Sequence, residues 1–384
     1  MNIKSFCSTS NVYIALWLIY NMQEVFFGEK GTLFSRIILL CLVLSSLYYM
    51  AFTLTRYRIT PYLRGLTILL SLFTVYGAAA FFVASNVSYI QSIYISLLPI
   101  FPFYVFTRKQ ILRRRQIQWW IVVFFITTTF QFFQNQEEMV MTSLEAGSEK
   151  EEFTNNVGYL FLALLPLLVF LNEKQLLQFV GLAFVMTFVV LGMKRGAIFI
   201  GVICVIWFLY NSLHLANRKR KTAVILLSMA LIIVSMYYVN YMLENSEYFN
   251  YRIQETLRGN SSGRNEIYSY FYNYFILEAD PLSFLFGGGA DKTVNLLGQH
   301  AHNDWLEIAV NQGLLGIFIY FFYWYNFYMI WKRSRWNAEI FMVLGLSFII
   351  HFLKTAFSMS YNDMSLYSTI CMGYCIGKID NRKK

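Results

Sequence analysis

Charged residues are scarce in this chain of 384 residues, at 14% of the sequence against 57% hydrophobic residues. Soluble domains carry charge on about a quarter of their residues, so a chain this poor in charge cannot cover a soluble surface. Apolar stretches of about 16 to 23 residues recur instead along the whole length, and each suits a bilayer core of about 30 Å. The sequence therefore predicts an all-α, polytopic membrane protein.

Cysteine and histidine are also few, with 5 and 4 residues. The cysteines fall mostly inside the apolar stretches without a C-x-x-C pair, so neither a disulfide framework nor a zinc site is expected. The D-x-D pair that holds Mg²⁺ in many nucleotide-sugar transferases is absent, and so is the H-E-x-x-H motif. No cleavable signal is evident, because the first apolar stretch lacks a small-residue cleavage site and reads as a span.

The apolar stretches predict about twelve membrane spans. They lie at residues 12–27, 33–55, 63–84, 87–106, 117–133, 157–171, 176–192, 196–213, 222–243, 314–331, 338–357 and 363–379. With the N-terminus inside, most Lys and Arg residues fall in the inward segments, which is the bias that sets orientation. Both termini are then cytoplasmic. The net charge of +10 follows from this topology and does not call for a nucleic-acid partner.

Two hydrophilic segments, 134–156 and 244–305, are long, and both face outward in this topology. A long loop on a membrane protein usually carries function or is disordered. The second segment is rich in aromatic residues, so we expect it to fold back on the bilayer surface. We therefore predict a single membrane domain, residues 1–384, with a large outer loop at 244–305 and a second outer loop at 134–156.

A few basic residues break the inward bias and lie in the predicted outer segments. Lys194 and Arg195 form a tight turn between two spans, and Arg258 and Arg264 lie in the large loop. An outward arginine suggests a bound anion, because its planar guanidinium group carries a permanent charge and suits phosphate. The alternative for Arg195 is that it only anchors two helix ends at the lipid headgroups.

The residues around Arg264 predict a helix start. Ser261 and Ser262 offer capping hydroxyl groups, and an aromatic amphipathic stretch follows until Pro281 stops it. Arg264 would then lie in the first helical turn, where exposed amides also favour an anion. The alternative for Arg258 and Arg264 is a salt bridge within the loop, to Glu255 or Glu266. The Gly287–Gly289 triplet that follows is a flexible turn that could let backbone approach a ligand.

Next comes the segment from His300 to Glu307. Asp304 and Glu307 have the spacing of a capping box, so a helix should begin there with His302 just before it. A neutral imidazole could accept a proton from a hydroxyl nucleophile, since its usual pKa is about 6.5. Two alternatives stay open. His302 could be a hydrogen-bonded interfacial histidine, or the H-x-H-x-D spacing could bind metal, although no third ligand cluster occurs elsewhere.

Four motifs in this order resemble the O-antigen ligase and polymerase superfamily, bacterial membrane glycosyltransferases that act on polyprenyl-diphosphate glycans. They are Lys194-Arg195-Gly196, Ser262-Gly263-Arg264, the residues LFGGG at 285–289, and His302-Asn303 followed by GLLG at 313–316. The resemblance is specific over about residues 190–320. Span number and topology extend it to the rest of the chain, and it implies a GT-C-like fold.

The resemblance implies a role for each matching residue. Arg195 and Arg264 would contact the lipid diphosphate, and His302 would be the base for the acceptor hydroxyl. No metal and no cofactor are implied, since arginines can stabilise the leaving diphosphate. Residues expected to support substrate binding are Lys194, Arg258, His300 and Asn303.

Within this superfamily we favour a polymerase that joins undecaprenyl-diphosphate-linked repeat units into O-antigen, capsular polysaccharide or exopolysaccharide. It would work on the outer face of the bacterial cytoplasmic membrane, in contact with membrane lipid and with a chain-length regulator as a candidate partner. A ligase that transfers the glycan to lipid A core is the alternative. A transporter or flippase of lipid-linked sugar is the rival outside the enzymes, although such proteins usually show internal repeats and midplane polar groups.

Overall fold

A computed structural model describes residues 8–27, 31–84, 87–145, 154–215, 218–257 and 263–382. These residues form helices joined by short connections, without a strand among them, which confirms the all-α prediction for the described ranges. The chain forms two compact units. Unit 1 contains residues 1–113, 263–336 and 351–384, and unit 2 contains residues 114–262 and 337–350.

Unit 1 combines both ends of the chain with the second half of the predicted outer loop. Its helices are α2 (Thr9–Asn21), α3 (Gln23–Phe27), α4 (Leu33–Arg56), α5 (Pro61–Ala84), α6 (Ser88–Leu97), α7 (Ile100–Arg108), α15 (Arg264–Asn273), α16 (Pro281–Phe286), α17 (Lys292–Leu297), α18 (Asp304–Arg333) and α20 (Leu366–Asn381). A π-helical turn, Tyr274–Glu278, extends α15. Helices α7 and α20 pack closely because Gly373 has no side chain: a Cβ there would lie 2.5 Å from that of Phe103.

Unit 2 contains α8 (Arg114–Glu145), α9 (Val157–Leu162), α10 (Leu165–Leu168), a 3₁₀ turn (Val169–Leu171), α11 (Gln175–Leu191), α12 (Arg195–Leu215), α13 (Arg218–Asn245) and α14 (Glu247–Leu257). It also holds the first part of α19 (Ala338–Phe357), whose last residues belong to unit 1. The close packing of α11 on α10 depends on Gly181, where a Cβ would lie 2.6 Å from the Leu168 side chain.

Seven helices in the described ranges are long and apolar enough to cross a membrane. They cover residues 33–56, 61–83, 88–108, 195–214, 221–245, 304–336 and 338–357. The described helices thus have the character of a polytopic membrane protein, as the composition predicts. The number of twelve spans stays a prediction. The predicted span at 157–171 is divided among α9, α10 and the 3₁₀ turn, and α11 is 17 residues long.

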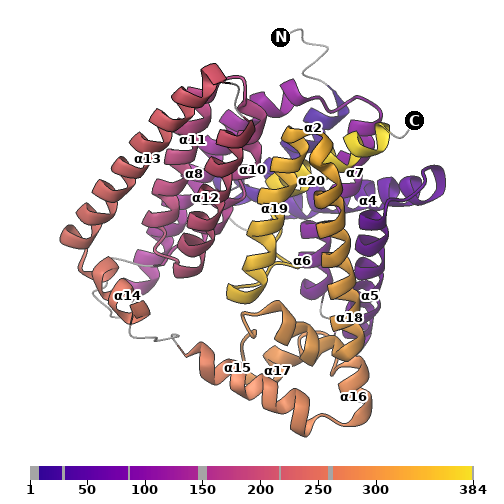
Figure 1. The fold of residues 1–384 in the computed structure, drawn as a ribbon. Helices are drawn as coiled ribbons and strands as arrows, with labels where there is room; N and C mark the ends of the chain where they lie inside the picture. The colour runs from indigo at the N-terminus through magenta and orange to yellow at the C-terminus, as the bar shows by residue number, and fades with distance from the viewer. Residues whose placement is uncertain are drawn as a thin grey trace. The chain divides into compact units, whose positions relative to one another are not determined.

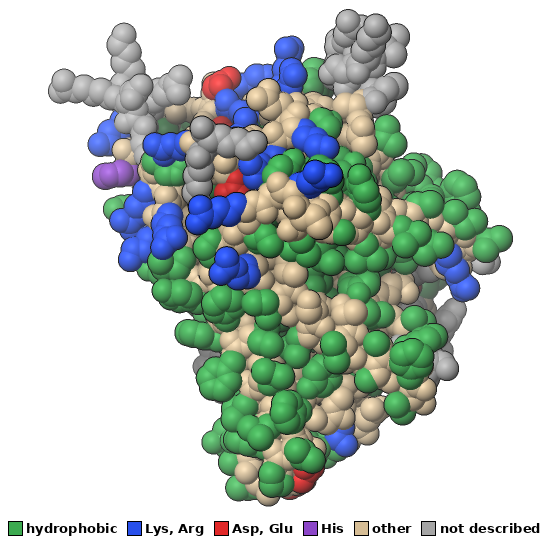
Figure 2. Space-filling model, turned by 90° about the vertical axis from the view of Figure 1, so that its right-hand side faces the viewer, with side chains coloured by type: hydrophobic (Ala, Val, Ile, Leu, Met, Phe, Trp, Pro, Cys, Tyr) green, Lys and Arg blue, Asp and Glu red, His purple; other side chains and the backbone are tan. Residues whose placement is uncertain are grey.

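The predicted outer loop at 244–305 is mostly helical in the described residues. The first part of the other hydrophilic segment, 134–156, belongs to α8, which continues to Glu145. In unit 1, Figure 1 shows α15, α16 and α17 at one end, with the C-terminal end of α20 at the other. Figure 2 shows Lys and Arg side chains gathered toward one end of the visible face, above a surface rich in hydrophobic side chains. Which end faces the cytoplasm stays a prediction.

Candidate functional site

Arg264 is the first residue of α15, as the sequence predicts. Gly263 precedes it with a φ of +77°, a left-handed conformation that glycine adopts without steric cost. One guanidinium nitrogen of Arg264 donates a hydrogen bond to the carbonyl oxygen of Phe357 at 2.8 Å. In the described part of the chain Arg264 forms no ion pair with Glu266, while the alternative pairs with Arg258 or Glu255 lie outside the described side chains. The predicted caps Ser261 and Ser262 lie outside the described residues.

Tyr268 lies one helical turn after Arg264 on the same face of α15 and connects it to the histidine segment. Its hydroxyl group is 3.3 Å from the carbonyl oxygen of His302 and 3.3 Å from that of Ala356. Burial raises the pKa of Tyr268, while the positive charge of Arg264 opposes that rise. The structure therefore brings Arg264 and the backbone of the His302-Asn303 pair together around a tyrosine that no sequence motif indicates.

His302 and Asn303 form the start of α18. His302 is exposed and has a φ of +52°, which is uncommon for a residue with a side chain. The side-chain oxygen of Asn303 accepts hydrogen bonds from the backbone N–H groups of Trp305 and Leu306, at 3.0 and 3.2 Å. The helix begins where the sequence predicts, but its cap is Asn303, and the expected capping box of Asp304 and Glu307 does not form.

Asp304 fixes this helix start against the segment that follows α19. Its carboxylate is fully buried and accepts hydrogen bonds from the backbone N–H of Ser360, at 2.9 and 3.1 Å, and from the hydroxyl group of Tyr320. The indole nitrogen of Trp305 also donates to the hydroxyl group of Thr355 at 3.0 Å. The last turn of α19 and the residues after it therefore support both Arg264 and the histidine segment.

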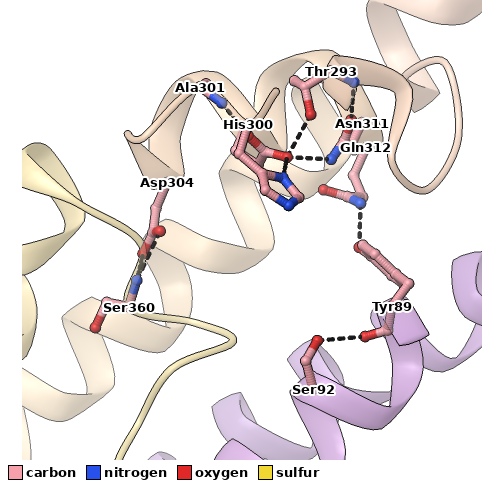
Figure 3. A network of polar contacts seen from close by, with 10 residues as sticks. Tyr89, Ser92, Thr293, His300, Ala301, Asp304, Asn311, Gln312 and Ser360 are labelled. Carbon is pink, nitrogen blue, oxygen red and sulfur yellow. Dashed lines mark hydrogen bonds and ion pairs between the residues drawn. The ribbon is translucent and has the colours of Figure 1, made fainter. Parts of the chain in front are cut away.

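Glu307 is the centre of a second buried network, whose other members Thr293, His300, Ala301 and Asn311 are labelled in Figure 3. One of its oxygens accepts from the side-chain nitrogen of Asn311 at 3.2 Å and from the hydroxyl group of Thr293, and lies 3.0 Å from Nδ1 of His300. Its other oxygen accepts from the backbone N–H of Ala301 at 2.7 Å. The sequence predicts only a helix cap at Glu307, because its partners Thr293 and Ala301 are brought to it by tertiary structure.

This network determines how His300 is presented. An ionised carboxylate only accepts hydrogen bonds, so Nδ1 of His300 is the donor and Nε2 is left as the outward nitrogen. The hydrogen bond to Glu307 also raises the pKa of His300. His300, predicted to support substrate binding, thus has an imidazole ring of fixed orientation with 41% of its side chain exposed.

The glycine triplet has a structural role that differs from the expected approach to a ligand. The N–H groups of Gly288 and Gly289 donate to the carbonyl oxygens of Val310 and Asn311, at 2.9 and 3.0 Å. A Cβ on Gly287 would lie 2.3 Å from the backbone of Asn311. The triplet packs at a break in α18, where Gly313 has a φ of +67°, and so holds the residues after α16 against α18.

Lys194 and Arg195 lie in unit 2, at the start of α12. The preceding residue, Met193, has a φ of +50° and is buried against Met242 and Phe249. The encounter of Arg195 with Arg264 and His302 of unit 1 stays a prediction. Arg258 lies outside the described residues.

A common backbone feature links the three residues predicted to be catalytic. A left-handed residue occurs just before α12, α15 and α18, at Met193, Gly263 and His302. Such a residue beside a helix N-terminus turns successive backbone N–H groups toward one side, an arrangement that favours anions. Arg195 and Arg264 add a full positive charge to two of these helix starts.

The H-x-H-x-D spacing does not produce a metal-ligand cluster here. Within the described ranges, no three His, Cys, Asp or Glu residues are placed to hold a metal ion, and Asp304 is occupied by Ser360 and Tyr320. Comparison with known proteins gives no assignment either: no protein-family model matches the chain, and a search of curated proteins finds no match.

Proposed function

We propose that this protein is a membrane glycosyltransferase that joins polyprenyl-diphosphate-linked oligosaccharide repeat units into a longer polysaccharide. The observation that carries the proposal is the meeting of Arg264 and Tyr268 of α15 with the backbone around His302, at the N-terminal end of α18, the longest apolar helix of the described residues. A cation for phosphate, a candidate base and exposed aromatic side chains for sugar stacking occur there together. The motif order that resembles O-antigen polymerases supports the same assignment.

Arg264 would bind the diphosphate of the donor. Its hydrogen bond to the carbonyl oxygen of Phe357 uses one of five N–H donors and fixes the direction of the guanidinium plane. The remaining donors suit two phosphate oxygens bidentately. Arg195 would supply a second positive charge from unit 2. Two guanidinium groups stabilise the negative charge that develops on the leaving diphosphate, so the reaction needs no metal ion.

His302 would act as the base. The acceptor hydroxyl oxygen attacks the anomeric carbon of the donor, the bond from that carbon to the diphosphate oxygen breaks, and polyprenyl diphosphate leaves. The hydroxyl proton passes to the imidazole as the new glycosidic bond forms. A single displacement of this kind inverts the anomeric configuration.

A specific observation favours His300 as a second candidate for the base. Its Nδ1 is held by the buried Glu307, which leaves Nε2 as the acceptor of a neutral ring with a fixed orientation. A histidine oriented by a carboxylate is a common arrangement for proton transfer. His300→Gln and His302→Gln therefore need to be compared. The histidine whose loss removes turnover but leaves donor binding intact is the base.

The function is tested by Arg195→Ala, Arg264→Ala and His302→Ala in cells that lack the native copy, with the surface glycan separated on a ladder gel. Arg335→Ala, an exposed arginine in a predicted cytoplasmic loop, is the matched control. If the protein is a polymerase, we expect the three variants to lose long chains and to accumulate single repeat units, with the control unchanged.

The other outcomes are equally distinct. Lipid-linked polymer that accumulates while lipid A receives no glycan would identify a ligase. Repeat units trapped on the cytoplasmic side would identify a flippase. An unchanged ladder in all three variants, at normal protein level, would overturn the site assignment.

A further inference from the structure

Unit 2 also has a surface groove whose lining contains none of the residues assigned above. A groove of about 850 Å³ runs between α8, α11 and the segment containing α10. Its lining on α8 extends from Arg115 to Phe133, which corresponds to about 27 Å of helix at 1.5 Å per residue. That length is close to the thickness of a bilayer core, about 30 Å.

The walls of the groove are apolar and open to the outside of unit 2. Ile126, Phe130 and Val180 are each about half exposed or more, at 64%, 49% and 56%. Gly181 keeps the floor narrow, because α11 packs there directly on Leu168. A groove of this length and lining fits extended hydrocarbon chains.

One end of the groove is positively charged. Arg115 and Lys174 line that end, both side chains are exposed, and the lining contains no acidic residue. Within the described residues, neither side chain forms an ion pair. Their neighbour Arg114 behaves differently, since it pairs with Glu173 at 2.7 Å and with Glu339 at 2.9 Å. The local acidic groups are thus taken by Arg114, and the two cations at the groove remain available to an anion.

We propose that this groove is a specific binding site for an anionic diacyl phospholipid, with the phosphate group at Arg115 and Lys174 and the acyl chains along α8 and α11. The combination of a charged end and an apolar length matches the two parts of such a lipid. In the topology predicted from charge, the two cations face the cytoplasm. The lipid is then one of the inner leaflet and distinct from the polyprenyl donor, whose diphosphate is assigned to the opposite side.

The test is native mass spectrometry of the full-length protein in detergent, with phosphatidylglycerol, phosphatidylethanolamine and a polyprenyl phosphate as separate probes. Arg115→Gln/Lys174→Gln removes both cations. Lys221→Gln/Arg335→Gln removes the same charge from two exposed residues outside the groove. Val180→Trp places a larger side chain in the apolar part of the groove. The elution profile of each variant on gel filtration reports whether the variant is folded.

We expect one retained phosphatidylglycerol, bound more tightly than phosphatidylethanolamine. A basic residue near an anionic headgroup contributes about fivefold in affinity, so the groove double variant should bind phosphatidylglycerol about 25-fold more weakly and the control should not change. Val180→Trp should weaken both phospholipids. Phosphatidylglycerol retention that is insensitive to the groove double variant overturns the proposal. Tighter retention of the polyprenyl phosphate, unaffected by that variant, would overturn it in favour of the isoprenoid.

Discussion

The two arginines assigned to the diphosphate begin their helices in similar ways but are held by different forces. Arg264 in unit 1 follows Gly263, an exposed residue whose left-handed conformation needs no support from packing. Arg195 in unit 2 follows the turn at Met193, whose left-handed backbone carries a side chain buried against Met242 and Phe249. One helix start is local in origin, and the other depends on the hydrophobic core of its unit.

The two helix starts differ in the free-energy cost of their left-handed residue. A left-handed conformation costs a residue with a side chain roughly 1–2 kcal/mol, and the burial of Met193 offsets that cost. Gly263 has no such cost, so the direction of Arg264 is set instead by its hydrogen bond to Phe357. The start of α12 thus depends on packing, whereas the direction of the Arg264 guanidinium group depends on one hydrogen bond.

The largest expected effect concerns both arginines at once. Arg264→Ala and Arg195→Ala should each lower turnover by about 10²–10³-fold, because each removes a charge that stabilises the leaving diphosphate. If both bind the same diphosphate, the double variant should lose less than the product of the two single losses. Rates of polyprenyl diphosphate release from the four proteins give this comparison. Strictly multiplicative losses would show that the two arginines act at separate places.

Met193→Ala should destabilise unit 2 by about 2 kcal/mol, because it leaves a cavity against Met242 and Phe249 and keeps the unfavourable backbone conformation. Thermal unfolding in detergent, followed through tryptophan fluorescence, measures this loss. Met236→Ala on α13 is the control, since its side chain is 69% exposed. Equal stability of the two variants would contradict a turn held by packing.

Gly263→Ala should cost less, about 1 kcal/mol, because the new Cβ meets only a carboxylate oxygen of Glu266, at an ordinary contact distance of 3.9 Å, and only the left-handed backbone is unfavourable. The substitution should therefore shift the start of α15 without unfolding unit 1. Limited proteolysis around residues 258–268, compared with turnover, detects that shift. Gly298→Ala, at another left-handed glycine with open space around it, is the matched control and should leave turnover unchanged.

The smallest effect is a pH dependence at the third helix start. The pKa of His300 is raised by Glu307 in the folded protein, so the pair stabilises the fold fully below the unfolded value of about 6.5. That stabilisation is lost as pH rises through the higher folded pKa. The melting temperature of the wild type should fall across this window, and His300→Gln should flatten the change. His302→Gln should retain it, and a flat wild-type profile would contradict the role of Glu307.

The sequence predicts the helix starts better than it predicts what holds them. The helix after Arg264 and the one after His302 begin where the sequence predicts, although the cap of the second is Asn303 and not the expected capping box of Asp304 and Glu307. The buried partners of Glu307 do not, because Thr293 and Ala301 approach it only after α17 has packed on α18. The sequence does not predict the left-handed turn at Met193 either, since methionine is not a residue typical of turns.

The packing of the glycine triplet is another feature that the sequence alone does not predict. The letters GGG indicate a flexible turn, and the structure places that turn tightly against the break at Gly313. The glycine triplet and Gly313 together allow one close backbone contact, and their positions in the sequence do not reveal that they meet. Two other predicted spans lie on short or interrupted helices that still give an apolar stretch in the sequence: 157–171 is divided among α9, α10 and a 3₁₀ turn, and 176–192 corresponds to α11 of 17 residues.

The most direct test of the central claim uses the purified protein in liposomes with a lipid-linked oligosaccharide as the only substrate, in the presence of EDTA. We predict polysaccharide of increasing length and one polyprenyl diphosphate released for each repeat unit added. Arg264→Ala and His302→Ala should lose both products together. Movement of the lipid-linked sugar across the bilayer without any new glycosidic bond would contradict the account, and so would bond formation that is unaffected by both substitutions.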